Sequence, residues 1–342
     1  MVDSLEGKIR LERFEGNPIL SPEGNSWKGR AVFNPGAVMF DGQVHILYRA
    51  VGKDQFSRQK FGRDYVSVFC LAKSDDGFNI TEDSGEPVIV PEYLFESAGV
   101  EDARVMKIGD HFFITYTGLQ IYYDDPARQR VVEDKFKRFL PKREKHEVFE
   151  EHRDGKWFIR ACMARTDNFK TYDKLGIVLP NETNKDIVLV PEPVNGRNHM
   201  YHRREPDIWI ADAEKLSRWG NHKLVLPTKP DSWKEKKVGA SCPPIKTEKG
   251  WLLFYHGVDD QKVYRVSAAM FALDDPARLV NDLDYPILEP EEEYELHGDV
   301  DNVVFPCGVV EKDGRYILYY GGADTYVGAA SIDKKKMLDA FD

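Results

Sequence analysis

Cysteine is scarce in this chain of 342 residues, which contains Cys70, Cys162, Cys242 and Cys307 and no CxxC pair. Each of them lies inside or beside an apolar run, so we expect buried reduced thiols rather than disulfide bonds or zinc ligands. Apolar runs long enough to span a bilayer are lacking, and no signal peptide is recognisable. Basic charge is also in deficit, since the formal net charge is −10. The pattern predicts a soluble cytoplasmic protein that binds neither nucleic acid nor a membrane surface.

What recurs along the chain is a short apolar run that ends in proline. Five such runs occupy 18–22, 87–91, 176–180, 223–227 and 286–290. Each is too short for a helix, and its prolines confine it to a sheet edge or a strand end. After each run, two predicted strands flank a turn that contains glycine, and a further strand rich in small residues follows. The sequence therefore predicts five copies of one four-stranded unit.

Five units at this spacing predict an all-β fold, a five-bladed β-propeller that forms a single domain over residues 1–342. Radial closure leaves only short sheet edges, and we expect the first apolar run to pair late in the circle and close it. The inner strands of the units converge at one end. Side chains at equivalent positions near that end of each strand are therefore expected to face one pocket. These side chains are Asn34, Asp102, Lys185, Lys237, Asp301 and Asn302.

One segment interrupts the repeat. Residues from about 119 to 157 are highly charged, and both signs mix between Lys135 and Glu151. We interpret this segment as a partly helical insertion in the second blade, which follows Asp102 closely. Loops of this length are often lids or oligomer contacts. A solvent-exposed surface loop without such a role explains the charge equally well.

The segment Glu101-Asp102-Ala103-Arg104 places two carboxylates and a guanidinium just before an apolar run. Taken alone, it indicates a surface ion pair that contributes little. Modified versions of this segment occur in the other units, and this changes the interpretation. The ends of the inner strands would then bring several charged side chains to one place. The carboxylates are Glu101, Asp102, Asp301 and Asp324, and the cations are Arg49, Arg104, Arg160, Lys185, Arg203, Lys237 and His256.

This combination of charges suits the cleavage of a glycoside. A carboxylic acid protonates the departing oxygen, and hydrolysis with inversion also needs a carboxylate base that holds a water molecule. Phosphorolysis replaces that water and base with inorganic phosphate, so it needs one acid and a cluster of cations that binds a dianion. A cationic cluster within an acidic chain fits phosphorolysis, although each cation singly is explained as a structural ion-pair partner.

Five motifs, in order over nearly the whole chain, resemble those of the mannoside phosphorylases of glycoside hydrolase family 130. They are Asn34-Pro35-Gly36-Ala37 with Leu47-Tyr48-Arg49-Ala50, Glu101-Asp102-Ala103-Arg104-Val105 with Tyr116-Thr117-Gly118, Asn184-Lys185-Asp186 with His202-Arg203, Gly239-Ala240-Ser241-Cys242-Pro243-Pro244-Ile245 with Tyr255-His256-Gly257, and Asn302-Val303-Val304-Phe305-Pro306 with Tyr320-Gly321-Gly322-Ala323-Asp324. The resemblance implies a five-bladed propeller and metal-free, inverting phosphorolysis of β-mannosides. It implies no cofactor, phosphate as co-substrate, and α-mannose 1-phosphate as product.

The resemblance also implies a role for each matching residue. Asp102 is the expected general acid, and its proton is thought to pass through a sugar hydroxyl. The mannosyl unit is expected to be held by Asn34, Arg49, Arg104 and Asp324, and phosphate by Arg160, Lys185, Lys237 and His256. The chain departs from the family at Ala103, where proline is usual, and in the charged insertion, which leaves the acceptor specificity undetermined.

Two alternatives stay open at this stage. A β-mannosidase of the same family would use water, but such hydrolases lack the phosphate-binding cations, so Lys237 and His256 favour phosphorolysis. A non-catalytic glycan-binding propeller would bind sugar without turnover. The sequence does not distinguish β-1,4 from β-1,2 linkages, nor does it identify the acceptor (glucose, mannose, N-acetylglucosamine or a longer chain) or exclude a homo-oligomer.

Overall fold

The computed structural model describes residues 7–137, 157–180 and 182–342, and most of them lie in β-strands. No helix in this described part is long and apolar enough to cross a membrane. The helices are short. They are α1 (Asp54–Phe61), η1 (Leu94–Glu96), α2 (Pro126–Lys135), α3 (Glu293–Leu296) and α4 (Lys334–Asp339).

The strands of the described residues form antiparallel groups that follow the chain. The first group contains β2 (Ala31–Phe40), β3 (Gln43–Val51), β4 (Ser67–Ser74) and β5 (Ile80–Ile89), and the second contains β6 (Gly99–Ile108), β7 (His111–Ile121), β8 (Trp157–Thr166) and β9 (Asp173–Ile177). A single parallel bridge between Ser67 and Gly99 joins these two groups into one sheet of eight strands. The all-β prediction is thereby confirmed.

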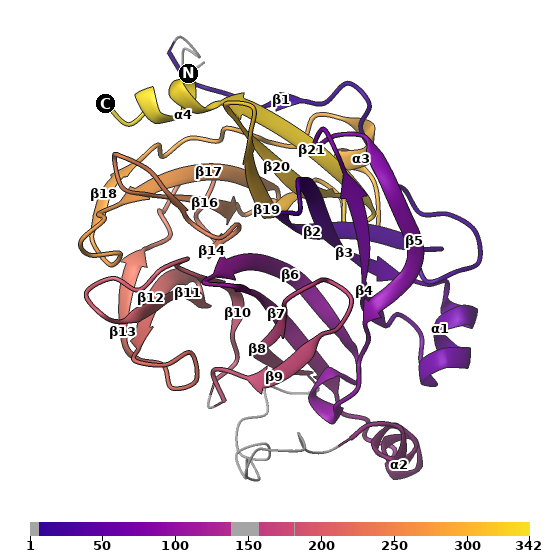
Figure 1. Cartoon of the computed structure of the whole chain (residues 1–342). Coiled ribbons are helices and arrows are strands. Elements are labelled where there is room, and N and C mark those ends of the chain that lie inside the picture. The colour runs from indigo at the N-terminus through magenta and orange to yellow at the C-terminus, as the bar shows by residue number, and fades with distance from the viewer. Residues whose placement is uncertain (1–6, 138–156, 181) are drawn as a thin grey trace.

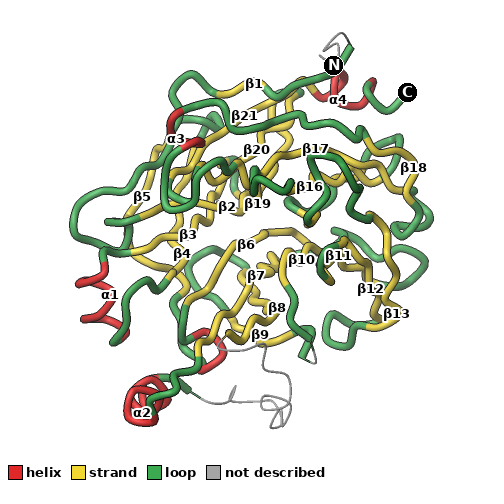
Figure 2. Tube along the Cα trace, turned by 180° about the vertical axis from the view of Figure 1, so that it is seen from behind, coloured by secondary structure: helices red, strands yellow, loops and turns green. Residues whose placement is uncertain are grey.

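Three further sheets follow. The third group is β10 (Lys185–Leu189), β11 (Asn198–Arg204), β12 (Asp207–Ala213) and β13 (Gly220–Leu226), and the fourth is β14 (Lys237–Ala240), β15 (Ile245–Lys246), β16 (Trp251–Val258), β17 (Tyr264–Phe271) and β18 (Leu279–Asp282). The fifth is β19 (Val304–Lys312), β20 (Arg315–Gly322), β21 (Tyr326–Asp333) and β1 (Glu12–Arg13). In Figure 1 the first strands β2, β6, β10, β14 and β19 lie toward the middle, and the last strands β5, β9, β13 and β18 lie near the rim. Figure 2 shows the same arrangement from behind.

The start of the chain pairs with its end, as the sequence predicts. Strand β1 runs antiparallel to β21, with Glu12 opposite Ser331, and Leu20 of the first apolar run bridges to Val327. The runs 87–91, 176–180 and 223–227 overlap the ends of β5, β9 and β13. The runs 18–22 and 286–290 make isolated bridges only, because their prolines cannot donate the hydrogen bonds that a longer ladder needs.

Neighbouring groups share hydrophobic cores. Ile46 and Tyr48 of the first group belong to the same buried cluster as Ile317 and Tyr319 of the fifth. A second cluster unites Tyr201 of the third group with other buried residues of the third and fourth groups. All four cysteines are buried, as predicted, and free. Packing of this kind holds the inner strands rigidly, so charged groups at their ends keep a fixed geometry.

The predicted insertion from about 119 to 157 is described only in part. Both predicted boundaries fall in strands, because Leu119 to Ile121 continue β7 and Trp157 begins β8. Between them, α2 begins after Asp125, whose side chain accepts a hydrogen bond from the backbone N–H of Ala127. Residues 138–156 lie outside the described residues.

Candidate active site

The inner strands of the first three groups carry the same irregularity. In each, the pairing with the next strand shifts its register, so that two residues lie opposite one. The first of these two residues is Asn34 in β2, Asp102 in β6 and Asp186 in β10, with φ of 46°, 57° and 55°. Asn and Asp tolerate this left-handed backbone better than most residues, and such a bulge re-aims the side chain that it carries. Three polar side chains are thereby placed at corresponding points of three strands.

These side chains border one cavity of about 310 Å³. Of the residues given a site role by the sequence, the structure brings Asn34, Arg49, Asp102, Lys185, Lys237 and Asp324 together in its lining, with Glu101 and Arg203 of the predicted charge cluster. The lining also contains Tyr65, Asp186, Tyr264, Val300, Val303 and Phe305. The cavity is therefore polar on most sides, with carboxylates and cations in contact.

Asp102 is held by two donors. Its Oδ1 accepts a hydrogen bond from Nδ2 of Asn34 at 2.8 Å and one from Nη1 of Arg49 at 3.3 Å. No described residue donates to its second carboxyl oxygen, Oδ2. Because Oδ1 is fixed from one side, the carboxyl group has a defined orientation, and Oδ2 is left to interact with a bound molecule.

Glu101 uses both of its oxygens to hold cations. Oε1 lies 2.6 Å from Nη2 of Arg49, and Oε2 lies 2.9 Å from Nζ of Lys185. Burial would raise the pKa of Glu101, but Arg49 and Lys185 lower it to about 2. The Arg49 guanidinium also lies over the ring of Phe33, 4.5 Å from its centroid. Glu101 is thus a permanent anion that positions two cations of the cavity.

Asp186 holds a second cluster of cations. It accepts hydrogen bonds from Nη2 of Arg104 at 2.9 Å and from Nη1 of Arg203 at 2.7 Å, and Nε2 of His256 lies 3.6 Å away. Burial opposes the charge of Asp186, but Arg203 and Arg104 hold its pKa below the usual range. Burial lowers the pKa of His256 to about 3, so its ring is neutral at pH 7.

Lys237 differs from the other cations of the cavity. Its Nζ lies 5.0 Å from the ring centroid of Tyr264, and no carboxylate of the described residues forms an ion pair with it. Arg203, by contrast, contacts both Asp186 and Glu205. The positive charge of Lys237 is therefore available to a bound anion.

Asp324 follows β20 in a turn where its φ is 49°. Burial raises the pKa of Asp324 to about 7, and the nearby charges of Asp102 and Glu101 add to this rise against the opposing effect of Arg49. No described residue makes an ion pair with Asp324 within the usual contact distance. The cavity thus holds a carboxyl group whose charge changes near neutral pH.

Two glycines of the predicted motifs let backbone approach these side chains. A Cβ atom at Gly239 would collide with the ring of His256 and would lie 2.5 Å from Oδ2 of Asp186. At Gly321 it would collide with Oδ1 of Asn34. Both positions therefore require glycine if His256, Asp186 and Asn34 are to keep their positions.

Comparison with known proteins fits this geometry. The model of a family described as beta-1,4-mannooligosaccharide phosphorylase matches residues 6–158 and 153–342. The chain belongs to glycoside hydrolase family 130. The motif resemblance is therefore confirmed, and the chain is an enzyme of a phosphorylase family.

This family 130 enzyme has relatives of similar length. It is 40% identical over 333 residues to a beta-1,2-mannobiose phosphorylase of a Thermoanaerobacter species, with 96% of this chain and 99% of the relative covered. It is 37% identical over 328 residues to a 1,2-beta-oligomannan phosphorylase of the same species, with 96% and 98% covered. Among solved structures, a complex of beta-1,2-mannobiose phosphorylase from Listeria innocua with beta-1,2-mannobiose matches with a TM-score of 0.79 at 25% identity, over 97% of this chain and 99% of that one.

Three of the residues that the family resemblance assigns to sugar or phosphate do not line the cavity of this family 130 enzyme. Arg104 and His256 are fully buried, and each contacts Asp186, which does line the cavity. Arg160 is fully buried in β8, where its guanidinium stacks 3.4 Å from the ring centroid of Phe158. Their predicted contacts with sugar or phosphate stay predictions.

Other residues of the cavity were not predicted from the sequence. Asp186 belongs to the motif Asn184-Lys185-Asp186, from which only Lys185 was predicted as a site residue, for phosphate binding. Tyr65 lies between α1 and β4 with a φ of 51°, and Phe305 lies in β19. No sequence signal distinguishes these aromatic residues from core residues. Asp301, a predicted carboxylate of the site, is exposed and does not line the cavity.

Proposed function

We propose that this family 130 enzyme catalyses the inverting phosphorolysis of β-mannosides, with inorganic phosphate as co-substrate and α-mannose 1-phosphate as product. The observation that carries the proposal is the combination, in one cavity, of a positioned carboxyl group and of Lys237, a cation that no described carboxylate neutralises. An acidic chain that keeps such a charge available has a site for an anion. The named activities of its relatives support the same reaction.

In this proposal Asp102 supplies the proton for the departing oxygen, by way of a sugar hydroxyl. The fixed Oδ1 and the available Oδ2 support this role, because a general acid must be oriented toward the group that it protonates. Asn34 and Arg49 would orient Asp102 and bind the mannosyl unit together with Asp324. The second carboxyl oxygen, and not the one held by Asn34, would face the substrate.

Phosphate would bind on the opposite side, where Lys185, Arg203 and Lys237 line the cavity. Arg104, predicted to hold the mannosyl unit, and His256, predicted to hold phosphate, would both act through Asp186, which they contact, rather than on the substrates directly. A neutral His256 cannot add positive charge, but it can fix the carboxylate that holds Arg203. Arg203 is thereby added to the predicted phosphate-binding residues.

The linkage is proposed to be β-1,2. The three relatives that cover 96% of this chain are named for β-1,2-linked mannosides. The relative named for β-1,4-mannooligosaccharides matches over 51% of the chain, and a 4-O-beta-D-mannosyl-D-glucose phosphorylase covers 90% of it at 26% identity. The five antiparallel groups are proposed to be the blades of a five-bladed propeller that forms one domain. Closure by β1 on β21 and shared cores between groups support this architecture.

A hydrolase of the same family is the alternative. The observation that favours it is Asp324, a carboxyl group in the cavity besides Asp102 that forms no ion pair with any described residue. In its charged form such a group can activate water as a general base. The presence of Lys237 near the same space supports phosphate instead.

The test incubates β-1,2-mannobiose and β-1,4-mannobiose with the enzyme, with and without phosphate. Mannose 1-phosphate and free mannose are measured separately. We expect mannose 1-phosphate that depends on phosphate and forms faster from the β-1,2 disaccharide. Free mannose at the same rate without phosphate would mean a hydrolase, and binding of either disaccharide without any product would mean a glycan-binding protein.

A further inference from the structure

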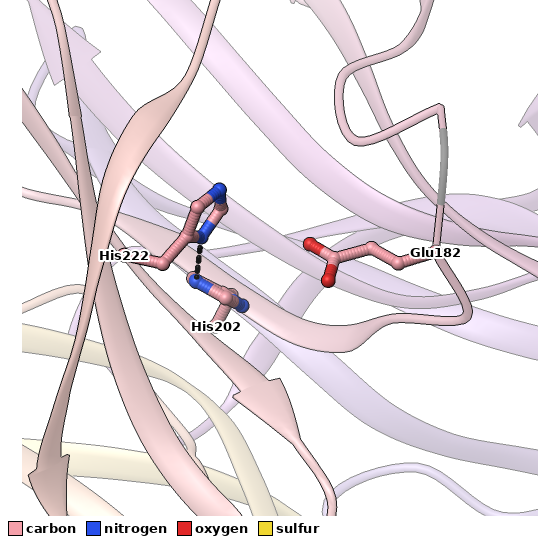
Figure 3. A group of neighbouring side chains, drawn as sticks. All are labelled: Glu182, His202 and His222. Carbon is pink, nitrogen blue, oxygen red and sulfur yellow. Dashed lines mark hydrogen bonds between the residues drawn. The ribbon is translucent and has the colours of Figure 1, made fainter.

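Three potential metal ligands meet in the third strand group, outside the active-site cavity. Glu182 precedes β10, His202 lies in β11 and His222 lies in β13 (Figure 3). Each offers one ligand atom, and these atoms all lie within 4.8 Å of one another. We propose that Glu182, His202 and His222 form a zinc-binding site. Two imidazoles and one carboxylate suit zinc, whereas Mg²⁺ and Ca²⁺ prefer oxygen ligands alone.

The two rings already face each other at nearly the required separation. Nε2 of His202 lies 2.9 Å from Nδ1 of His222. Two nitrogen ligands at about 2.0–2.1 Å from one tetrahedral zinc ion lie about 3.3 Å apart. The ion would be accommodated if the two nitrogens moved apart by about 0.4 Å and both rings turned so that their lone pairs point at one ion rather than at each other. Two coordination bonds would then replace the hydrogen bond between the rings.

A buried amide next to His202 supports the site. Nδ2 of Asn184 lies 2.9 Å from Nδ1 of His202, and Oδ1 of Asn184 is buried without a hydrogen-bond partner. Turning the amide group by half a turn lets Oδ1 accept a hydrogen bond from Nδ1–H. Nε2 of His202 then carries its lone pair toward His222 and Glu182. Ligand histidines usually donate their other ring N–H in this way, which fixes the tautomer and the ring.

Glu182 is oriented and accessible. Its Oε2 accepts a hydrogen bond from Nε of Arg204 at 2.7 Å, which leaves Oε1 for a metal ion. Glu182, His222 and Arg204 line a cavity of about 420 Å³ on this side of the molecule. The cavity gives the ion a path of entry and room for a water molecule to complete four-fold coordination.

The site would lie behind the active-site cavity. Successive strand residues point to opposite faces, and His202 and Asn184 directly precede Arg203 and Lys185, which line that cavity. Lys185 and Arg203 are also partners in the register of β10 and β11. Zinc would thus join β11, which carries Arg203, to the segment before β10 and to β13. The inference concerns a binding site and does not depend on the proposed reaction.

The test is calorimetric titration of zinc into protein that has been freed of metal by chelation, with zinc-dependent thermal stability as a second measurement. We expect wild type to bind one equivalent and to melt at a higher temperature with zinc. His222→Ala and Glu182→Gln should weaken zinc binding at least about 100-fold, and Asn184→Ala about 10- to 100-fold. Both ligand variants change partly exposed side chains, and circular dichroism verifies their folding.

A matched control uses His111, an exposed histidine whose Nδ1 lies 2.6 Å from Asp167. His111→Ala should bind zinc like wild type, since a surface pair of this kind lacks the third ligand. The proposal is overturned if wild type binds no zinc, or if either ligand variant retains an affinity within about tenfold of wild type, a loss too small for a first ligand. In that case the two rings form a hydrogen bond and nothing more.

Discussion

The two sides of the active-site cavity are built from corresponding positions of the repeat, but their charges are used differently. On the carboxylate side, Asp102 and Glu101 are already engaged by Asn34 and Arg49. On the cationic side, Lys237 has no carboxylate partner among the described residues. Lys185 begins β10 as Lys237 begins β14, yet Lys185 forms an ion pair with Glu101 at 2.9 Å.

This difference shows that one side is assembled before any ligand binds, while the other keeps a charge for the ligand. A carboxyl group that two donors hold does not need to reorganise during the reaction. Such a preorganised group stabilises a transition state without a free-energy cost of reorganisation. A lysine without a partner gains most when a dianion arrives. Loss of a residue on the carboxylate side should therefore reduce turnover, and loss of Lys237 should reduce phosphate binding.

The largest expected effect tests the carboxylate side. Asp102→Asn keeps the shape and the acceptor oxygen for Asn34 but removes the acidic proton. We expect kcat to fall by more than about 100-fold, the lower range for loss of a general acid. The KM for each substrate should change little. The measurement is the initial rate of mannose 1-phosphate release with both substrates varied.

Asp110→Asn is the matched control, because Asp110 is an exposed aspartate in the turn that follows β6. It should behave like wild type. A purified, folded Asp102→Asn protein that retains kcat within about tenfold of wild type would exclude Asp102 as the acid, since such a loss is below the range for this role.

The next effect distinguishes the two lysines. Lys237→Ala should raise the KM for phosphate about 10- to 100-fold, the equivalent of about 1.5–3 kcal/mol for a charged hydrogen bond, and leave the KM for the glycoside nearly unchanged. Lys185→Ala should raise both KM values, because it also releases Glu101 and so loosens Arg49. Kinetics with one substrate varied at a time separate the two patterns.

Lys236 provides the control for this pair. It precedes Lys237, is exposed and forms a surface ion pair with Asp260, so Lys236→Ala should leave both KM values near wild type. If Lys237→Ala raised both KM values equally, phosphate would not bind at Lys237, and the contrast between the two sides would fail.

Much of this site could be predicted from the sequence, because the repeat is local. Each strand pair is short and can be recognised by its turn, so the start of each inner strand can be located in the sequence. Asn34, Asp102, Lys185 and Lys237 could therefore be placed around one pocket before the structure was known. Arg49 and Asp324 could be placed there too, because they lie at or just beyond the ends of the second strands. All six line the cavity.

The depth of the remaining residues could not be predicted, and the bulges explain why. A bulge adds one residue to a strand and exchanges the faces to which the following side chains point. Arg104 follows the bulge at Asp102 and is fully buried, with its guanidinium on Asp186. Only the pairing register shows this. Tyr65 comes from a connection whose path depends on tertiary packing.

The smallest expected effect concerns Asp324 and pH. Its pKa is raised from the usual 3.8 to about 7, so the folded protein binds this proton more tightly than the unfolded chain does. The stability gained from the protonated carboxyl is complete below about pH 4 and is lost as the pH rises to about 7. Asp324→Asn stays neutral throughout, so its stability relative to wild type should increase from pH 5 to pH 8.

Because the carboxyl group is partly exposed, we take the pH-dependent difference as about 1 kcal/mol, which corresponds to about 2 °C in Tm for a chain of this size. The measurement is thermal unfolding of both proteins at pH 5 and pH 8, and Asp313→Asn, in the exposed turn before β20, controls for the loss of one negative charge. A Tm difference that does not change with pH would mean that Arg49 keeps Asp324 charged in the folded protein. Asp324 would then be a permanent anion like Glu101, and the contrast of the carboxylate side with the cationic side would be sharper.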